Sequence, residues 1–198
     1  MRIGVLTTLR DEAGSLPHFC AVLESWERHP AVEALVCSFY ENDSSDATVS
    51  VLEQWLQHRH GHLRSEQLGQ ERLKDRQTLR TKRMAAARNK ALEPLLSESL
   101  DWLLVLDADL QFQARHLFDL HQVLHRHPAA AMACASALTN IPDMFGHSPW
   151  SYYDTYALAD RQGRLGITCT SVPFWELDDR ATWLSGRPVP VLSAFGGM

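Results

Sequence analysis

Two carboxylates that follow a short apolar run in mid-chain have the residue types and spacing for metal chemistry. The five apolar residues 102–106 lack helical periodicity, which is typical of a strand buried on both faces. Asp107 and Asp109 come next, and side chains two residues apart point to the same side wherever strand geometry persists. Carboxylates at the carboxyl edge of such a sheet suit Mn2+ or Mg2+, so we take both as candidate metal ligands. Many strands, however, end in acidic turn residues that bind no metal.

Basic residues cluster just before this strand, although the whole chain has a net charge of -5. The cluster comprises Arg72, Lys74, Arg76, Arg80, Lys82, Arg83, Arg88 and Lys90. A solvated helix face is one explanation, and a cationic wall for an anionic ligand is the other. Together with metal-binding carboxylates, these arginines favour a metal-bound di- or triphosphate.

Alternating strand and helix signals must position these groups. The sequence predicts strands at 3–9 and 34–40, each followed by a helix, with Ser15 and Asp46 as the helix caps. This order implies right-handed βαβ units and a largely parallel sheet. Later elements are a short strand near Leu63, helices at 75–97 and 114–125, and a central strand at 129–136.

Further polar residues fall in loops. Glu41 and Asn42 directly follow the second strand, where their side chains can hydrogen-bond to a nucleoside, whereas residues 43–46 also fit a simple capped turn. His58, His60 and His62 alternate around Arg59 and Gly61, a pattern more typical of a loop than of a zinc site. P-loop, GxGxxG and GxSxG motifs are absent from the sequence.

Composition sets the broad class. A chain of 198 residues with 45% hydrophobic residues suits one soluble domain, and its negative charge argues against general nucleic-acid binding. No apolar run has the length of a transmembrane segment, and the four cysteines lack CxxC spacing, so we expect buried, reduced thiols. We therefore expect a cytoplasmic protein, with peripheral membrane attachment left open. Because residues 188–198 read as a strand that enters a glycine turn, we expect one domain over 1–198 that is truncated at its C-terminus.

Five sequence blocks resemble a known family. They are residues 40–48 (YENDSSDAT), 80–92 (RTKRMAAARNKAL), 106–109 (LDAD), 153–160 (YDTYALAD) and 193–197 (SAFGG). In this order they are similar to the fungal capsule-associated α-1,3-mannosyltransferase family and its bacterial relatives, which have the GT-A fold. The sequence departs from the family at Ala159, where an arginine is usual, and at Met198, beyond which the family continues.

The resemblance implies a fold, a donor and a set of site residues. The fold is a GT-A, Rossmann-like, three-layer αβα sandwich, and the donor is a GDP- or UDP-linked sugar, with GDP-mannose as one candidate, bound with Mn2+ or Mg2+. Asp107 and Asp109 would hold the metal. The nucleoside would contact Thr8, Arg10, Glu41, Asn42 and Asp46, and the diphosphate and sugar would contact Arg83, Arg88 and Asn89. A glycan or other hydroxyl compound would be the acceptor, with Asp154 as the catalytic candidate and Asp160, Asp178 and Asp179 as rivals.

Three other functions fit parts of the pattern. A nucleotide- or glycan-binding module without turnover would keep the same fold. A haloacid-dehalogenase-like phosphatase also has a DxD motif, but after its first strand. A nucleotidyltransferase would have a glycine-rich loop where residues 10–14 stand.

Overall fold

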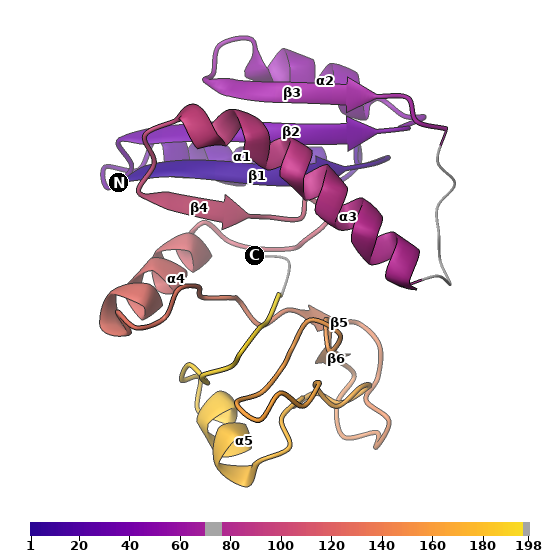
Figure 1. The fold of residues 1–198 in the computed structure, drawn as a ribbon, viewed down its shortest axis with the longest axis vertical. Coiled ribbons are helices and arrows are strands. Elements are labelled where there is room, and N and C mark those ends of the chain that lie inside the picture. Colours follow the sequence, from indigo (N-terminus) through magenta and orange to yellow (C-terminus); the bar gives the residue numbers. More distant parts are fainter. Residues whose placement is uncertain (70–76, 196–198) are drawn as a thin grey trace. The chain divides into compact units, whose positions relative to one another are not determined.

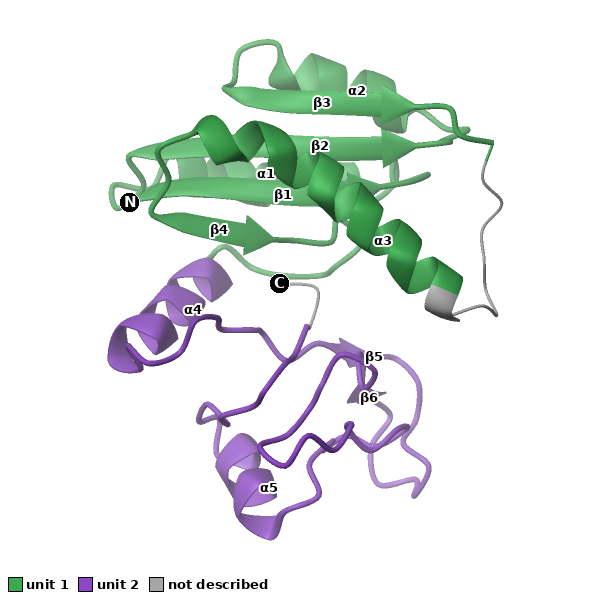
Figure 2. Ribbon diagram, viewed as in Figure 1, with its two compact units in different colours: residues 1–114 green, residues 115–198 purple. Residues whose placement is uncertain are grey.

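A computed structural model describes residues 1–69 and 77–195 of the chain. The chain divides into two compact units, residues 1–114 and 115–198, which are coloured separately in Figure 2.

Unit 1 is an α/β unit built on a parallel sheet. In its described residues the sheet has four strands, in the order β3-β2-β1-β4. These are β1 (Arg2–Leu9), β2 (Ala34–Asn42), β3 (Gly61–Glu66) and β4 (Trp102–Val105). Figure 1 shows all four strands running in the same direction. The α/β class and the parallel sheet are therefore confirmed.

Helices cover both faces of this sheet. Helices α1 (Leu16–Glu27) and α2 (Thr48–Leu56) lie behind it in Figure 1, whereas α3 (Gln77–Leu92) crosses in front. A 3-10 helix, η1 (Glu93–Ser97), continues α3. The Rossmann-like three-layer αβα arrangement is thus confirmed in unit 1.

Strands β1 and β2 are buried on both faces because their two sets of alternating side chains each meet a helical layer. On the α3 side, Val36 and Tyr40 of β2 pack with Ala91. On the other side, the ring of Phe39 meets Phe19 of α1 and Trp55 of α2 edge-on, at centroid distances of 6.2 and 5.9 Å. This two-sided burial explains why β1 and β2 read as continuous apolar runs.

Unit 2 has little regular structure in its described residues. Its elements are α4 (Arg115–Arg126), β5 (Leu138–Thr139), β6 (Ser151–Tyr152) and α5 (Leu177–Leu184). Tyr152, Leu158 and Phe174 form its buried apolar cluster. Carboxylates organise its turns: Asp160 is buried and accepts hydrogen bonds from the backbone and the guanidinium of Arg164.

Three expectations from the sequence were wrong. Residues 129–136 are not a central strand but irregular backbone. Helix α3 ends at Leu92 rather than Ser97, because the segment that includes Pro94 winds as the 3-10 helix η1. The described cysteines are not all buried, since Cys169 is exposed, although Cys20 and Cys37 are in the core.

Candidate active site

The carboxyl ends of the parallel strands bring the loops of the candidate site to one edge of unit 1. Leu9, at the end of β1, is paired with Glu41 of β2. Strand β4 pairs with β1 as far as Val105, and the Leu106 N–H then donates to the Leu6 carbonyl at 3.0 Å. Residues 10–14, 42–47 and 107–109 therefore all follow strands that end at this edge. Ligands of open parallel sheets bind at this edge.

The loops after β1 and β2 are cross-linked by hydrogen bonds from backbone to side chain. Asp11 accepts from the Ser45 N–H at 2.7 Å, and Asp46 accepts from the Ala13 N–H at 3.0 Å. Asp46 also accepts from the backbone N–H of Thr48 at 2.9 Å and from its hydroxyl, at the start of α2. The hydroxyl of Thr48 is the main reason that the pKa of Asp46 lies below its usual value. The sequence predicted Asp46 as a helix cap; its carboxylate does serve the start of α2, although Ala47 occupies the cap position itself.

Glu41 lies beneath these loops and is fully buried. Its carboxylate accepts from the Ser44 N–H and from the Ser65 hydroxyl, both at 2.6 Å. Each carboxylate oxygen thus has a donor from the chain itself. In this structure Glu41 holds the turn after β2 in place, and its contact with a nucleoside stays a prediction.

Asn42 and Arg10 converge on Asp43 from two strands. The Asn42 amide donates to Asp43 at 2.8 Å, and a guanidinium nitrogen of Arg10 lies 4.0 Å from the same carboxylate oxygen. Asp43 also accepts from the Leu68 and Gly69 N–H groups at 2.6 and 2.8 Å. Asp11 and Asp43 both adopt positive φ, near 56° and 59°, a conformation that Asp tolerates better than most residues. The sequence analysis gave neither of these two aspartates a role of its own.

The proposed metal ligands and the basic helix meet at Asp107. A guanidinium nitrogen of Arg88, in α3, lies 3.4 Å from Asp107 Oδ1, and both side chains are about three-quarters buried. Ala108 and Asp109 form a turn, so strand geometry does not persist there and alternation does not place the two carboxylates on one side. Asp107 and Asp109 nevertheless remain neighbouring carboxylates at a strand end. This hard-oxygen donor set fits Mg2+ or Mn2+, which commonly take one or two protein carboxylates plus phosphate and water.

The three site candidates on helix α3 differ in their exposure to solvent. Arg83 and Asn89 are exposed, whereas Arg88 is on the half-buried side of the helix. Lys90 donates to Glu66 and to the Tyr40 hydroxyl, which itself donates to Glu66 at 2.7 Å. Residues Arg72, Lys74, Asp75 and Arg76 lie outside the described residues.

Thr8 completes the nucleoside set at the end of β1, where it is partly buried and paired with Tyr40 of β2. Two surface concavities occur among the described residues, one in each unit. One, of about 430 Å3, is lined by residues of α2 and β3, and another, of about 500 Å3, lies beside Trp175 in unit 2. A metal–diphosphate ligand is held at strand ends by charge and backbone, so a deep apolar cavity is not a requirement there.

Asp154 belongs to unit 2. It is partly buried, and its carboxylate accepts from the Ala157 N–H at 3.1 Å within a turn. Its rivals Asp160 and Asp179 are buried against Arg164 and Arg161, and Asp178 is exposed in the first turn of α5. The catalytic role of Asp154 stays a prediction.

Residues 3–198 match the family described as Cryptococcal mannosyltransferase 1. The chain belongs to this family. The match covers both units, and it confirms the resemblance drawn from the five sequence blocks. None of the curated proteins and none of the solved structures compared with the chain matches it.

Membership in the Cryptococcal mannosyltransferase 1 family identifies the chain as a glycosyltransferase. A glycosyltransferase takes a sugar donor and an acceptor, and the carboxyl edge of unit 1 is the candidate donor site. Among residues 1–69 and 77–195, no helix is both long and apolar enough to cross a membrane.

Proposed function

We propose that this chain transfers a sugar, with mannose as the first candidate, from a nucleotide-sugar donor to a hydroxyl acceptor, in a reaction that depends on Mn2+ or Mg2+. The pairing of Arg88 with Asp107 carries the proposal. It brings the candidate metal ligand Asp107 and the basic helix, which are separate elements of the fold, together at one point on the carboxyl edge of the sheet.

The difficult step of this reaction is the departure of the nucleoside diphosphate, on which negative charge develops. A divalent cation held by Asp107 and Asp109 would supply Lewis-acid neutralisation of its charge. The guanidinium of Arg88 can donate to phosphate oxygens in the same place, and Arg83 and Asn89 of α3 offer further donors. Since Arg88 is already held by Asp107, its position costs little further ordering when the donor binds.

The nucleoside part of the donor would lie against the cross-linked loops after β1 and β2. Thr8, Arg10 and Asn42 offer hydrogen-bonding side chains there, and Glu41 and Asp46 fix the loop backbone. Hydrogen bonds that tie the two loops together pre-organise the backbone groups that face a ligand, which lowers the cost of binding.

The acceptor would bind unit 2. Trp150, Tyr153 and Tyr156 are each at least two-fifths exposed, and Asp154 stands among them in the sequence. Aromatic rings pair an apolar face with polar groups and so suit a sugar surface. In this proposal Asp154 accepts the proton of the attacking hydroxyl.

The direct test is transfer from radiolabelled GDP-mannose and from a matched panel of UDP- and GDP-sugars, with Mn2+, with Mg2+ and with a chelator. We expect release of the nucleoside diphosphate and labelling of a mannoside or galactoside acceptor only when metal is present. Equal turnover in the chelator would contradict the metal dependence. Saturable donor binding without transfer to any acceptor, and without hydrolysis, would instead favour a binding module.

A further inference from the structure

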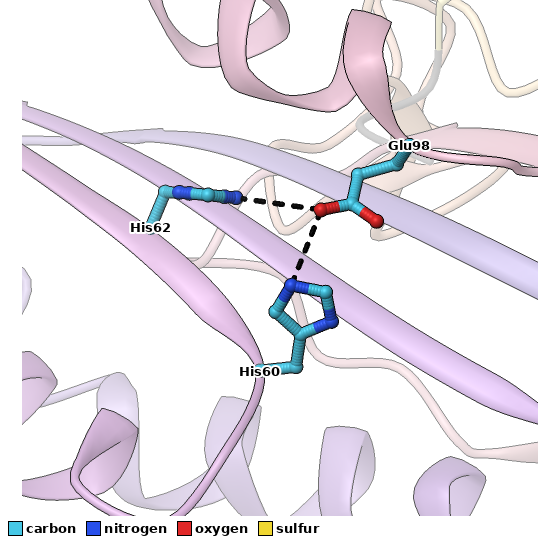
Figure 3. Close-up of side chains that lie close together, drawn as sticks. All are labelled: His60, His62 and Glu98. Carbon is cyan, nitrogen blue, oxygen red and sulfur yellow. Dashed lines mark ion pairs between the residues drawn. The ribbon is translucent and has the colours of Figure 1, made fainter.

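Three potential metal ligands meet at the opposite edge of the same sheet. Figure 3 shows the rings of His60 and His62 pointing toward the carboxylate of Glu98. One ligand atom from each residue lies within 4.8 Å of the other two, and no other group of three His, Cys, Asp or Glu residues in the described chain meets this criterion. The sequence analysis treated His58, His60 and His62 as a loop, because Glu98 is remote in the sequence.

This cluster is separate from the candidate donor site. His60 immediately precedes β3 and His62 is its second residue, so both lie at the amino end of the strand. Glu98 follows η1, before β4 begins. The donor-site loops follow the carboxyl ends of the strands, so a ligand at Glu98 would not contact Asp107.

The distances suit a small transition-metal ion. His60 Nε2 lies 3.1 Å and His62 Nε2 lies 3.9 Å from the same oxygen, Glu98 Oε1. Ligands of tetrahedral zinc, at about 2.0–2.2 Å from the ion, are separated by roughly 3.3 Å, so both distances to Glu98 Oε1 lie within about 0.6 Å of this spacing. A set of two imidazoles and one carboxylate is typical of zinc.

His62 provides a second, independent observation. Its Nε2 is shielded from solvent and makes no hydrogen bond in the structure. The 3.9 Å separation from Glu98 Oε1 is too long for a hydrogen bond. A buried polar atom without a partner is costly, and a metal ion bound between Nε2 and the carboxylate would remove that cost.

The backbone brings the two imidazoles to this position. A Cβ atom on Gly61 would lie 2.6 Å from the Cys37 carbonyl oxygen, so only glycine allows β3 to begin this close to β2. Gly61 separates the two histidines, and their rings lie 6.1 Å apart between centroids. The close start of β3 thus places both rings beside the segment that carries Glu98.

We propose that His60, His62 and Glu98 form a Zn2+ site whose fourth position is taken by water. The ion would tie the edge strand β3 to the segment between η1 and β4, which are more than 30 residues apart in the chain. Its role would be to stabilise unit 1, since it lies at the sheet edge opposite to the donor site. The competing explanation is an ordinary ion pair between Glu98 and a protonated histidine.

The test is a Zn2+ titration of the metal-free full chain by competition with a chromophoric chelator, in excess Mg2+ to occupy the donor-site carboxylates. We expect one Zn2+ per chain. H60Q, H62Q and E98Q should each weaken binding at least tenfold, whereas the neighbouring exposed histidine variant H58Q should bind as the wild type does. H60Q is the safest variant for folding, since the His60 side chain is 61% exposed.

Co2+ provides a second readout. We expect visible absorption bands of a tetrahedral Co2+ site in the wild type and in H58Q, and their loss in E98Q. Zn2+ should also raise the thermal midpoint of the wild type and of H58Q but not of H60Q. Unchanged Zn2+ affinity in H60Q and E98Q, or no saturable site in the wild type, would overturn the proposal and leave the ion pair. Neither result bears on sugar transfer.

Discussion

Arg88 differs from an ordinary surface arginine in its burial and in its contact with a carboxylate. It is about three-quarters buried on α3 and contacts Asp107, so its guanidinium is held where a diphosphate would bind in the proposed function. The sequence resemblance assigned both Arg83 and Arg88 to the diphosphate and sugar, with no means of distinguishing between these two arginines. Burial makes that distinction, and burial depends on how α3 crosses the sheet.

Replacing Arg88 by alanine should weaken binding of a nucleoside diphosphate by roughly tenfold to a hundredfold, the range that corresponds to a lost charged hydrogen bond of about 1.5–3 kcal/mol. Binding of the bare nucleoside should change little. Calorimetry with GDP and guanosine measures both. Arg28→Ala is the matched control, because Arg28, directly after α1, has a side chain that is 70% exposed. Equal losses for the two ligands would mean that Arg88 supports the fold rather than the phosphates.

The burial of Glu41 could not be predicted from its position in the sequence. Its place at the end of a strand predicted a nucleoside contact, which stays a prediction; the structure shows it buried, with both oxygens engaged by Ser44 and Ser65. Alternation along β2 accounts for this, since Glu41 shares the side of Phe39 that faces α1 and α2. The carboxyl end of a strand thus located the loop correctly but did not show which side chains face out of it.

Glu41→Ala should lower the free energy of unfolding by about 1–3 kcal/mol, because it leaves the partly buried Ser44 N–H without its acceptor. Urea denaturation measures this change, with Glu53→Ala on the exposed face of α2 as the control. A variant as stable as the wild type, but defective in nucleoside binding, would show instead that Glu41 contacts the ligand directly.

Regular elements with strong periodic patterns could be predicted from the sequence. β1, β2, β4, α1 and α4 lie within a few residues of their expected bounds, because each carries a clear apolar pattern. The strand predicted at residues 129–136 was wrong because alanines and other small residues bury little apolar area, so forming a strand there gains little hydrophobic stabilisation. Short apolar runs of this kind do not determine secondary structure by themselves.

Contacts between elements were not predictable from local patterns. The Lys90–Glu66–Tyr40 cluster ties α3 to β3 and β2. The pKa of Glu66 is lowered to about 2, mainly because Lys90 donates a hydrogen bond to its carboxylate and secondly because Tyr40 does. The same cluster raises the pKa of Lys90, chiefly through Glu66.

This depressed pKa predicts a pH dependence of stability. In the unfolded chain Glu66 titrates near its ordinary value of 4.5, so its contribution is complete above that pH and is lost as the pH falls toward about 2. The difference in unfolding free energy between the wild type and Glu66→Gln should therefore be largest above pH 5 and shrink steadily below pH 4.5. Urea denaturation across pH 2.5–6 tests this, with Glu53→Gln as control. A difference independent of pH would contradict the assignment.

The whole molecule consists of two units with different character. Unit 1 carries a regular sheet, whereas unit 2 depends on turns fixed by buried carboxylates such as Asp160 and Asp143. Such turns leave few periodic signals, which is why the sequence predicted no helix or strand between residues 136 and 188. The family match spans both units, so the transferase activity that it implies belongs to the chain as a whole.

Donor and acceptor functions should therefore separate by unit. Asp154→Asn should lower the rate of sugar transfer by roughly 100-fold or more, the usual contribution of a general base. It should leave the affinity for the donor nucleotide within twofold. Asp178→Asn, an exposed carboxylate in unit 2, is the control. Unchanged transfer by Asp154→Asn would remove Asp154 from the mechanism and leave the donor site untouched.

The central claim is that Asp107 and Asp109 hold a divalent cation together with a nucleoside diphosphate. Calorimetric titration of GDP into the wild type, Asp107→Asn and Asp109→Asn, with and without Mn2+, tests it most directly, with Asp119→Asn as a control for the substitution. We predict that Mn2+ strengthens GDP binding at least tenfold in the wild type and in Asp119→Asn, and has no effect in the other two variants. Folding of each variant is checked by its thermal midpoint. The same Mn2+-dependent gain in Asp107→Asn and Asp109→Asn would contradict the account.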